Sequence, residues 1–191
     1  ASTLYESAQS LLKLIDDILQ YSELESGDLT LQSKPVGLRD AIESTIQLNA
    51  PQAHAKHLEL VSLVYNDVPD SLLGDEKRLI QLLNNLVSNA IKFTGGGEVV
   101  VRVMTEGGTD GSVQLGFTVS DTGIGISLQD KESLFEAFNQ GEVSAKRIFG
   151  GTGLGLSMCQ IISRSMNGSI SINSSPGEGS SFHFSVPIVL N

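Results

Sequence analysis

The sequence predicts an α/β protein in which helices cover one face of a mixed sheet and a separate helix precedes this unit. Helical and strand-like segments alternate, but the last two strand-like segments form a hairpin, which favours a mixed sheet over an all-parallel one. Seventeen of the 20 glycines lie after residue 94, so the first half is helix-rich and the second half is rich in turns. At about 150 residues per domain, 191 residues predict one such unit with an appendage.

The N-terminal residues predict a helix whose apolar or small side chains repeat every three or four positions. One helix cannot bury such a heptad seam by itself, so we expect it to pack against partner helices; packing on its own domain is the alternative. Gly27 ends this helix, and residues 28–37 are expected to be a linker. The seam consists of Leu4, Ala8, Leu11, Ile15, Ile18 and Ser22, widened by Leu12 and Leu19.

The remaining elements follow from hydrophobic periodicity and from turn residues. Asp75, directly after Gly74, is a good N-cap for the long helix that follows it. A glycine-rich turn over residues 107–111 joins two strands in the middle of the chain. In order, we expect helix 38–55, strand 58–65, helix 75–93, strands 98–104 and 113–120, a short helix near 128–138, helix 154–166, and strands 169–174 and 181–189.

The composition excludes several classes of function. The net charge of −10 argues against sequence-independent binding to nucleic acid or to an anionic membrane. No window of about 18 apolar residues predicts a transmembrane helix, and the first residues do not resemble a signal peptide. The single cysteine, Cys159, excludes a disulfide within the chain and is expected in the core. Because the chain begins with Ala1, we expect it to be a fragment of a longer protein.

The helix over residues 75–93 carries two asparagines on the face opposite its apolar residues. At 100° per residue, Asn85, Asn89 and Lys92 share one polar face with Arg78 and Gln81. Asparagine is a mediocre helix former, so a merely solvated face would more often carry Glu and Lys. An asparagine oxygen suits Mg²⁺ and a lysine suits phosphate, which makes this face a candidate site. A solvated face is the alternative.

Two glycine-containing segments are suited to hold a nucleotide. Asp121 ends an apolar strand, and Gly123 and Gly125 let the backbone turn beside its carboxylate, which can accept a hydrogen bond from an amine such as adenine N6. A plain strand-ending turn is the alternative. Residues 150–155 open a helix with bare amide groups and the positive end of its dipole, which suits phosphate. A long polar loop rather than a strand precedes them, so the dinucleotide-binding fingerprint is excluded.

The connection between Gly125 and Gly150 is longer than compact domains usually contain without a functional reason. It holds an apolar anchor over residues 134–138 and, further on, the adjacent cations Lys146 and Arg147. A loop that is flanked by glycines and carries two cations predicts a lid over a triphosphate. A surface loop with an incidental basic pair is the alternative.

Together these segments resemble the sequence boxes of sensor histidine kinases, in the order of that family. Residues 11–27 are similar to the second helix of the dimerisation and histidine-phosphotransfer bundle, which accounts for the heptad seam. The motifs are most similar to those of hybrid kinases of the GacS/BarA/RetS kind. Residues 75–94 resemble the N box, 121–125 the G1 box, 134–140 the F box, 151–156 the G2 box and 177–182 the closing glycine turn.

This resemblance implies the Bergerat ATP-binding sandwich of the GHKL superfamily over residues 38–191, after a partial bundle over residues 1–27. Its cofactors would be ATP and Mg²⁺. Asn89 would bind the metal, Asn85 would lie near the metal's water and the phosphates, and Lys92 would contact phosphate. The other nucleotide-binding residues would be Asp121, which recognises adenine, with Phe93, Gly123, Gly125, Ile126, Lys146, Arg147, Gly151, Thr152, Gly153, Leu154 and Gly155.

The implied reaction is transfer of the γ-phosphoryl group of ATP to a histidine on the bundle. The bundle's first helix, with its acceptor histidine, is absent from this sequence, so we expect the chain to bind ATP without phosphorylating itself. His54, His57 and His183 are expected to be ordinary surface or packing residues. Ala137 stands where the F box commonly has proline, which is expected to loosen the lid without abolishing nucleotide binding.

Two other functions remain open at this point. The first is hydrolysis of ATP, as in ATPases of the gyrase, Hsp90 or MutL type. Those relatives place a glutamate base where this chain has Asn85, and an amide cannot take a proton from water, so transfer is favoured over hydrolysis. A regulatory, pseudokinase-like module that pairs with another histidine kinase through the N-terminal helix is the second alternative. Nucleic acid is not an expected partner. The resemblance implies a homodimer through the bundle, a receiver domain or response regulator as partner, and a membrane-anchored parent with this chain on its cytoplasmic side.

Overall fold

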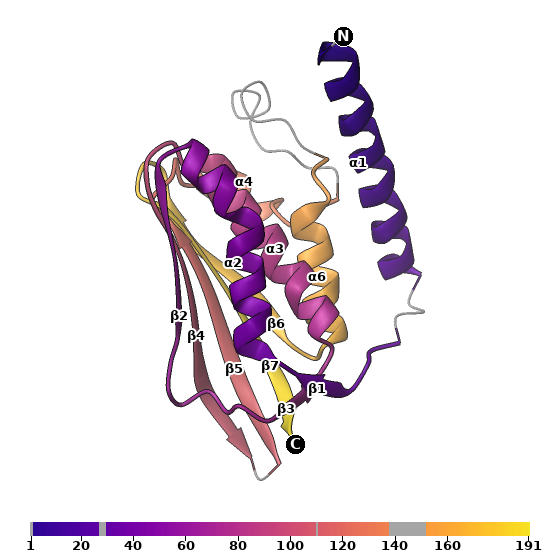
Figure 1. Cartoon of the computed structure of the whole chain (residues 1–191), viewed down its shortest axis with the longest axis vertical. Helices are drawn as coiled ribbons and strands as arrows, with labels where there is room; N and C mark the ends of the chain where they lie inside the picture. Colours follow the sequence, from indigo (N-terminus) through magenta and orange to yellow (C-terminus); the bar gives the residue numbers. More distant parts are fainter. Residues whose placement is uncertain (1, 27–29, 110, 138–151) are drawn as a thin grey trace.

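The computed structural model describes residues 2–26, 30–109, 111–137 and 152–191. Helix α1 (Ser2–Glu25) stands beside an α/β unit that contains the other elements, as Figure 1 shows. This arrangement confirms the fold class expected from the sequence. No helix in these ranges is long and apolar enough to span a membrane.

One mixed sheet forms a full layer of the α/β unit (Figure 1). Its strands follow the order β1-β3-β7-β5-β4-β2, and β6 pairs with β7 as the expected closing hairpin. Strands β2 and β4 run parallel, and the other pairs are antiparallel. The strands are β1 (Lys34–Val36), β2 (Leu58–Val64), β3 (Leu72–Gly74), β4 (Gly97–Thr109), β5 (Ser112–Asp121), β6 (Ser169–Ser175) and β7 (Gly179–Leu190).

Three helices cover one face of this sheet (Figure 1): α2 (Leu38–Ala55), α3 (Glu76–Phe93) and α6 (Gly155–Ser165). Asp75 caps α3, as expected, because its side chain accepts a hydrogen bond from the Arg78 amide at 3.1 Å. The rings of Phe117 on β5 and Phe184 on β7 stack under the helices with their centroids 4.4 Å apart. Each such buried ring contributes roughly 1.5–3 kcal/mol, so helix and sheet layers are held mainly by apolar burial.

Cys159 lies on α6 in this core and is fully buried, which confirms the expectation from the sequence. Its Sγ faces the Leu82 carbonyl oxygen at 3.8 Å. Burial raises the pKa of the thiol to about 12, so it stays protonated near neutral pH. A nucleophilic role for this cysteine is therefore excluded on chemical grounds.

Two short strands, β1 at the edge of the sheet and its neighbour β3, were not expected from the sequence. Strand β1 lies within the segment expected to be a linker, and it pairs antiparallel with β3 at the edge of the sheet. Each strand has three residues, which is too short for a periodic pattern, and β1 contains Pro35. Proline is compatible with an edge strand because its missing N–H is not needed by a further neighbour.

Two expected boundaries were wrong. Helix α4 (Leu128–Glu132) ends well before residue 138, and Leu134, Phe135 and Ala137 pack against the core from turns instead. The glycine-rich segment after Glu106 continues β4 to Thr109, since Gly107 and Gly108 pair with Gln114 and Val113. In both places, packing or strand pairing with a distant segment overrides the local signal.

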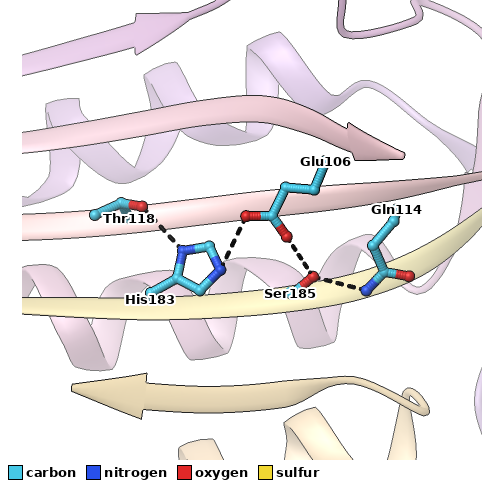
Figure 2. A network of polar contacts seen from close by, with 5 residues as sticks. All are labelled: Glu106, Gln114, Thr118, His183 and Ser185. Atoms are coloured by element: carbon cyan, nitrogen blue, oxygen red, sulfur yellow. Dashed lines mark hydrogen bonds and ion pairs between the residues drawn. The ribbon is translucent and has the colours of Figure 1, made fainter. Parts of the chain in front are cut away.

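The face of the sheet opposite the helices carries a polar network, which Figure 2 shows. Glu106 lies where the register of β4 against β5 shifts, and its carboxylate is 3.0 Å from His183 Nε2 and accepts from Ser185 Oγ at 2.6 Å. A Cβ at Gly116 would be 2.2 Å from Glu106 Oε1, so this glycine leaves room for the carboxylate. His183, expected to be an ordinary residue, thus holds a surface network and also contacts Thr118 Oγ1 at 3.1 Å.

Candidate functional site

The polar face of α3 meets the start of α6. Asn85 and Asn89 are both partly exposed, and the Asn85 amide donates to the Gly155 carbonyl oxygen at 3.4 Å. A Cβ at Gly155 would lie 3.8 Å from Asn89 Nδ2 and 3.9 Å from Asn85 Cγ, which are ordinary contact distances. The fold therefore brings both asparagines against the glycine segment that was expected to hold phosphate.

Asp121 stands at the end of β5, beside the turn that follows it. Its Oδ1 accepts hydrogen bonds from the amides of Gly123 at 2.8 Å and Ser180 at 3.3 Å. Burial raises the pKa of this carboxyl, and the hydrogen bonds from Gly123, Ser180 and the Thr94 hydroxyl offset part of that rise. The result is an oriented, partly desolvated carboxylate.

The turn after Asp121 is packed so closely that glycine is required. Gly125 has a φ of +68°, and a Cβ there would lie 1.9 Å from the Ser175 carbonyl oxygen. Gly179 has a φ of +85°, and its Cβ would lie 2.0 Å from the Asp121 carbonyl oxygen. The G1 turn and the turn between β6 and β7 thus lock together around Asp121.

Serines of this second turn are residues that the sequence analysis missed. The Ser174 hydroxyl accepts from the Ile126 amide at 2.9 Å and donates to the Gly179 carbonyl oxygen at 2.8 Å. Ser180 supplies an amide to Asp121. Both serines are buried, and their only sequence signal is their position beside the closing glycine turn.

The end of α3 lies next to the G1 turn. The Lys92 ammonium stands 4.8 Å from the centroid of the Phe93 ring, and the Phe93 carbonyl oxygen accepts from the Ile124 amide at 3.3 Å. Lys56, which the sequence analysis did not single out, donates to the carbonyl oxygens of Ile91 at 2.8 Å and of Lys92 at 2.7 Å. A cation at a helix C-terminus satisfies carbonyls that have no helical partner, so Lys56 fixes the end of α3.

The approach to α6 is described from Thr152 onward. The Thr152 hydroxyl oxygen accepts from the Leu154 amide at 3.4 Å, one residue before α6 begins, and Gly153 has a φ of +72°. Parts of the F box, the lid and the glycine segment before α6 lie outside the described residues, among them Phe138, Gln140, Lys146, Arg147, Gly150 and Gly151. Asn85, Asn89 and Gly155 are brought to one place, with Thr152 three residues before Gly155, whereas Asp121, Gly123 and Gly125 form the second part of the candidate site.

The described ranges contain no group of three or more His, Cys, Asp or Glu residues that could hold a metal ion. Asn85 and Asn89 offer amide oxygens at the end of the site where α3 meets α6. Such a donor set fits an ion that takes few protein ligands and shares phosphate oxygens, as Mg²⁺ does.

Comparison with known proteins gives the family. The family model of histidine kinase-, DNA gyrase B- and HSP90-like ATPases matches residues 74–190. The sensor histidine kinase GacS of Pseudomonas protegens is 52% identical over 184 residues, which are 96% of this chain and 20% of that protein. The signal transduction histidine-protein kinase BarA of Escherichia coli is 43% identical over 190 residues, 100% of this chain and 21% of that protein. The chain thus spans about a fifth of the length of these relatives.

Solved structures agree with the fold. Full-length ShkA in complex with AMPPNP has a TM-score of 0.86 and 32% identity, covering 100% of this chain and 38% of that one. The Acinetobacter baumannii histidine kinase AdeS has a TM-score of 0.76 at 20% identity, covering 100% of this chain and 83% of that one, and supports the fold alone. The chain therefore belongs to the histidine kinase-, DNA gyrase B- and HSP90-like ATPases and carries the catalytic domain of the sensor histidine kinase type.

Proposed function

We propose that residues 38–191 bind ATP and that the parent protein transfers its γ-phosphoryl group to a histidine on a helical bundle, of which residues 1–27 form part. The observation that carries this proposal is the meeting of α3 with the start of α6, where Asn85, Asn89 and Gly155 come together. Relatives named as sensor histidine kinases, and a similar structure that holds AMPPNP, support it.

Asp121 is the residue that we assign to the base. Because its Oδ1 accepts two main-chain amides, the carboxylate has a fixed orientation. An ionised carboxylate only accepts hydrogen bonds, so it favours an amino group such as adenine N6 over a carbonyl oxygen at the same place. Gly123, Gly125, Ile126 and Phe93 would border the base through the turn beside it.

We assign Asn89 as the Mg²⁺ ligand, with Asn85 beside the metal's water and Lys92 beside phosphate. When bound, the ion would neutralise charge on the phosphates as the γ-phosphoryl group moves. The start of α6, from Thr152 to Gly155, would offer amides and the positive end of the helix dipole to the same phosphates.

Transfer rather than hydrolysis is favoured because Asn85 stands where the related ATPases use a glutamate base, and an amide takes up no proton near neutral pH. The lid roles of Lys146 and Arg147, and the phosphate role of Gly151, are part of the proposal. We also propose that the parent protein forms a homodimer through α1, has a receiver domain or response regulator as partner, and is anchored in a membrane.

Calorimetric titration of the 191-residue chain with ATP tests the binding step. Binding should be tighter with Mg²⁺ than without it, and Asp121→Asn should weaken it while Glu59→Gln, on exposed β2, leaves it unchanged. Equal ATP affinity in correctly folded Asp121→Asn and wild-type chains would contradict the adenine assignment.

Phosphoryl transfer needs a nucleophile in line with the γ-phosphate at about 3–3.5 Å. The acceptor helix is not part of the 191-residue chain, so the chain alone should take up no label from γ-labelled ATP. Addition of a complete bundle should give an acid-labile label. In that system Asn89→Ala should lower the rate of labelling far more than ATP affinity. Acid-labile labelling of the chain alone would overturn the proposed division of roles and direct attention to His54, His57 and His183.

A further inference from the structure

Helix α1 contacts the catalytic unit through one narrow face. Asp17 Oδ2 accepts a hydrogen bond from the Thr152 hydroxyl at 2.9 Å, and Gln20 Oε1 accepts from the Gln81 side-chain amide at 2.9 Å. One turn further, Leu24 is only 3% exposed. These three residues are spaced three and four positions apart, so they lie on the same side of the helix.

The apolar seam of α1 lies on the other side. Leu11 is 58% exposed, Ile15 44%, Ile18 41% and Leu19 57%. At 100° per residue these side chains centre about 145° from Asp17. Helix α1 can therefore contact partner helices through the seam and the catalytic unit through Asp17 at the same time, and release of one contact does not require release of the other.

The contact of Asp17 is made at the phosphate end of the candidate site. Thr152 links α1 to α6, because its hydroxyl donates to Asp17 and accepts from the Leu154 amide. The Asp17 carboxylate thus stands near the positive end of the α6 dipole, where negative charge is favoured. A bound triphosphate would favour the same region, and its charge would repel the carboxylate.

We propose that Asp17 couples the position of α1 to nucleotide binding. In the nucleotide-free chain the carboxylate holds Thr152 and keeps α1 docked; phosphate at the start of α6 weakens this contact, and a docked α1 in turn lowers nucleotide affinity. This reciprocity is required of any two binding events that oppose each other. Asp17 is a positioning residue that acts through Thr152, and the inference rests on the proposed nucleotide site.

The test compares Asp17→Asn with Asp16→Asn in the 191-residue chain. Both changes remove one negative charge from α1, but Asp16 is exposed and its neighbour Asp17 faces Thr152. Asparagine keeps an accepting oxygen, so the change isolates the charge. Calorimetry should give AMPPNP affinity at least about fivefold higher for Asp17→Asn and unchanged for Asp16→Asn, since couplings of this kind typically begin near that size.

Hydrogen exchange of the amides of residues 14–25 is a second measurement. Its rate would not respond to AMPPNP if Asp17 had only a structural role. AMPPNP should speed exchange there in the wild-type chain, and it should have little further effect in Asp17→Ala, in which exchange is already fast. Equal affinities of Asp17→Asn, Asp16→Asn and wild type, or exchange that AMPPNP leaves unchanged in wild type, would overturn the coupling and leave the nucleotide site intact. Failure of the wild-type chain to bind AMPPNP at all would overturn the nucleotide site itself.

Discussion

The two ends of the candidate nucleotide site are built in different ways. At the Asp121 end, two turns of one folded unit approach so closely that only glycine fits at Gly125 and Gly179, and main-chain amides fix the carboxylate. At the other end, the Thr152 hydroxyl donates a hydrogen bond to Asp17 on α1, an element outside that unit. The geometry of the Asp121 end, proposed to hold the base, is determined by the α/β unit alone. The geometry of the Thr152 end, proposed to hold phosphate, also depends on the position of α1.

The largest expected effect is at the rigid end. Gly125→Ala would place a Cβ 1.9 Å from the Ser175 carbonyl oxygen at a φ of +68°, so the free energy of unfolding should fall by about 3 kcal/mol from strain and overpacking together. Gly177→Ala is the control: it also has a positive φ, +80°, but nothing lies within 4 Å of its Cβ, and it should cost only about 1–2 kcal/mol. Urea unfolding of the two variants measures the difference, and equal losses would mean that the two turns do not lock together.

The Asp121→Asn change tests adenine recognition and the stability of the fold by separate measurements. ATP affinity should fall by about 1.5–3 kcal/mol at neutral pH, the range for a hydrogen bond to a charged group. Burial raises the pKa of Asp121 in the folded chain, so its proton stabilises the fold in acid and that contribution is lost as pH rises through the folded pKa.

The stability of Asp121→Asn relative to wild type should therefore increase from acidic to neutral pH, because asparagine carries no charge to desolvate. Urea unfolding at several pH values follows this trend, with Glu59→Gln as the exposed control. A relative stability that falls over the same interval would show that the carboxylate is more strongly held by Gly123 and Ser180 than it is penalised by burial.

Lys56→Met tests the support of α3, which contributes to both ends of the site. The change removes a donor to the carbonyl oxygens of Ile91 and Lys92 while keeping an apolar stem, so unfolding free energy should fall by about 1–2 kcal/mol. ATP affinity should fall with it, since Lys92 and Phe93 end this helix. Lys77→Met, at an exposed position of α3, should change neither quantity.

The smallest effect is expected on the face of the sheet without helices. Glu106→Gln keeps the geometry of the Ser185 contact but loses the charge opposite His183, and such partly exposed pairs contribute at most about 1 kcal/mol. Urea unfolding of the variant and of the wild-type chain measures this loss. ATP affinity should not change; a change in it would link this face to the site.

Long elements could be predicted from the sequence because each carries its own signal. The amphipathic pattern and Asp75 cap locate α3, and alternation locates β5 and β7. Short or context-dependent elements could not: β3 has three residues, and the extension of β4 through Gly107 depends on a partner strand. The residues at these positions are equally compatible with turns, and only pairing with a neighbouring strand makes them part of the sheet.

For the candidate site, the glycine motifs predicted which segments matter but not how they meet. Nothing local in Thr152 indicates a partner 135 positions earlier on α1, and Leu24 belongs to no apolar seam although it is buried. The closeness of Gly125 to Ser175 likewise exists only once β6 and β7 have folded. The segments that carry the candidate site could thus be predicted from composition and spacing, whereas contacts between distant segments required the fold.

The protonated thiol of Cys159 makes this chain convenient for site-specific labelling. It is the only cysteine in the sequence, and burial that raises its pKa to about 12 leaves almost no thiolate for a maleimide or a nitroxide reagent to attack. Two cysteines introduced at exposed positions, one on α1 and one on α2, could therefore carry a pair of probes without removal of the native residue. The separation of the probes would then report directly on how far α1 moves when a nucleotide enters.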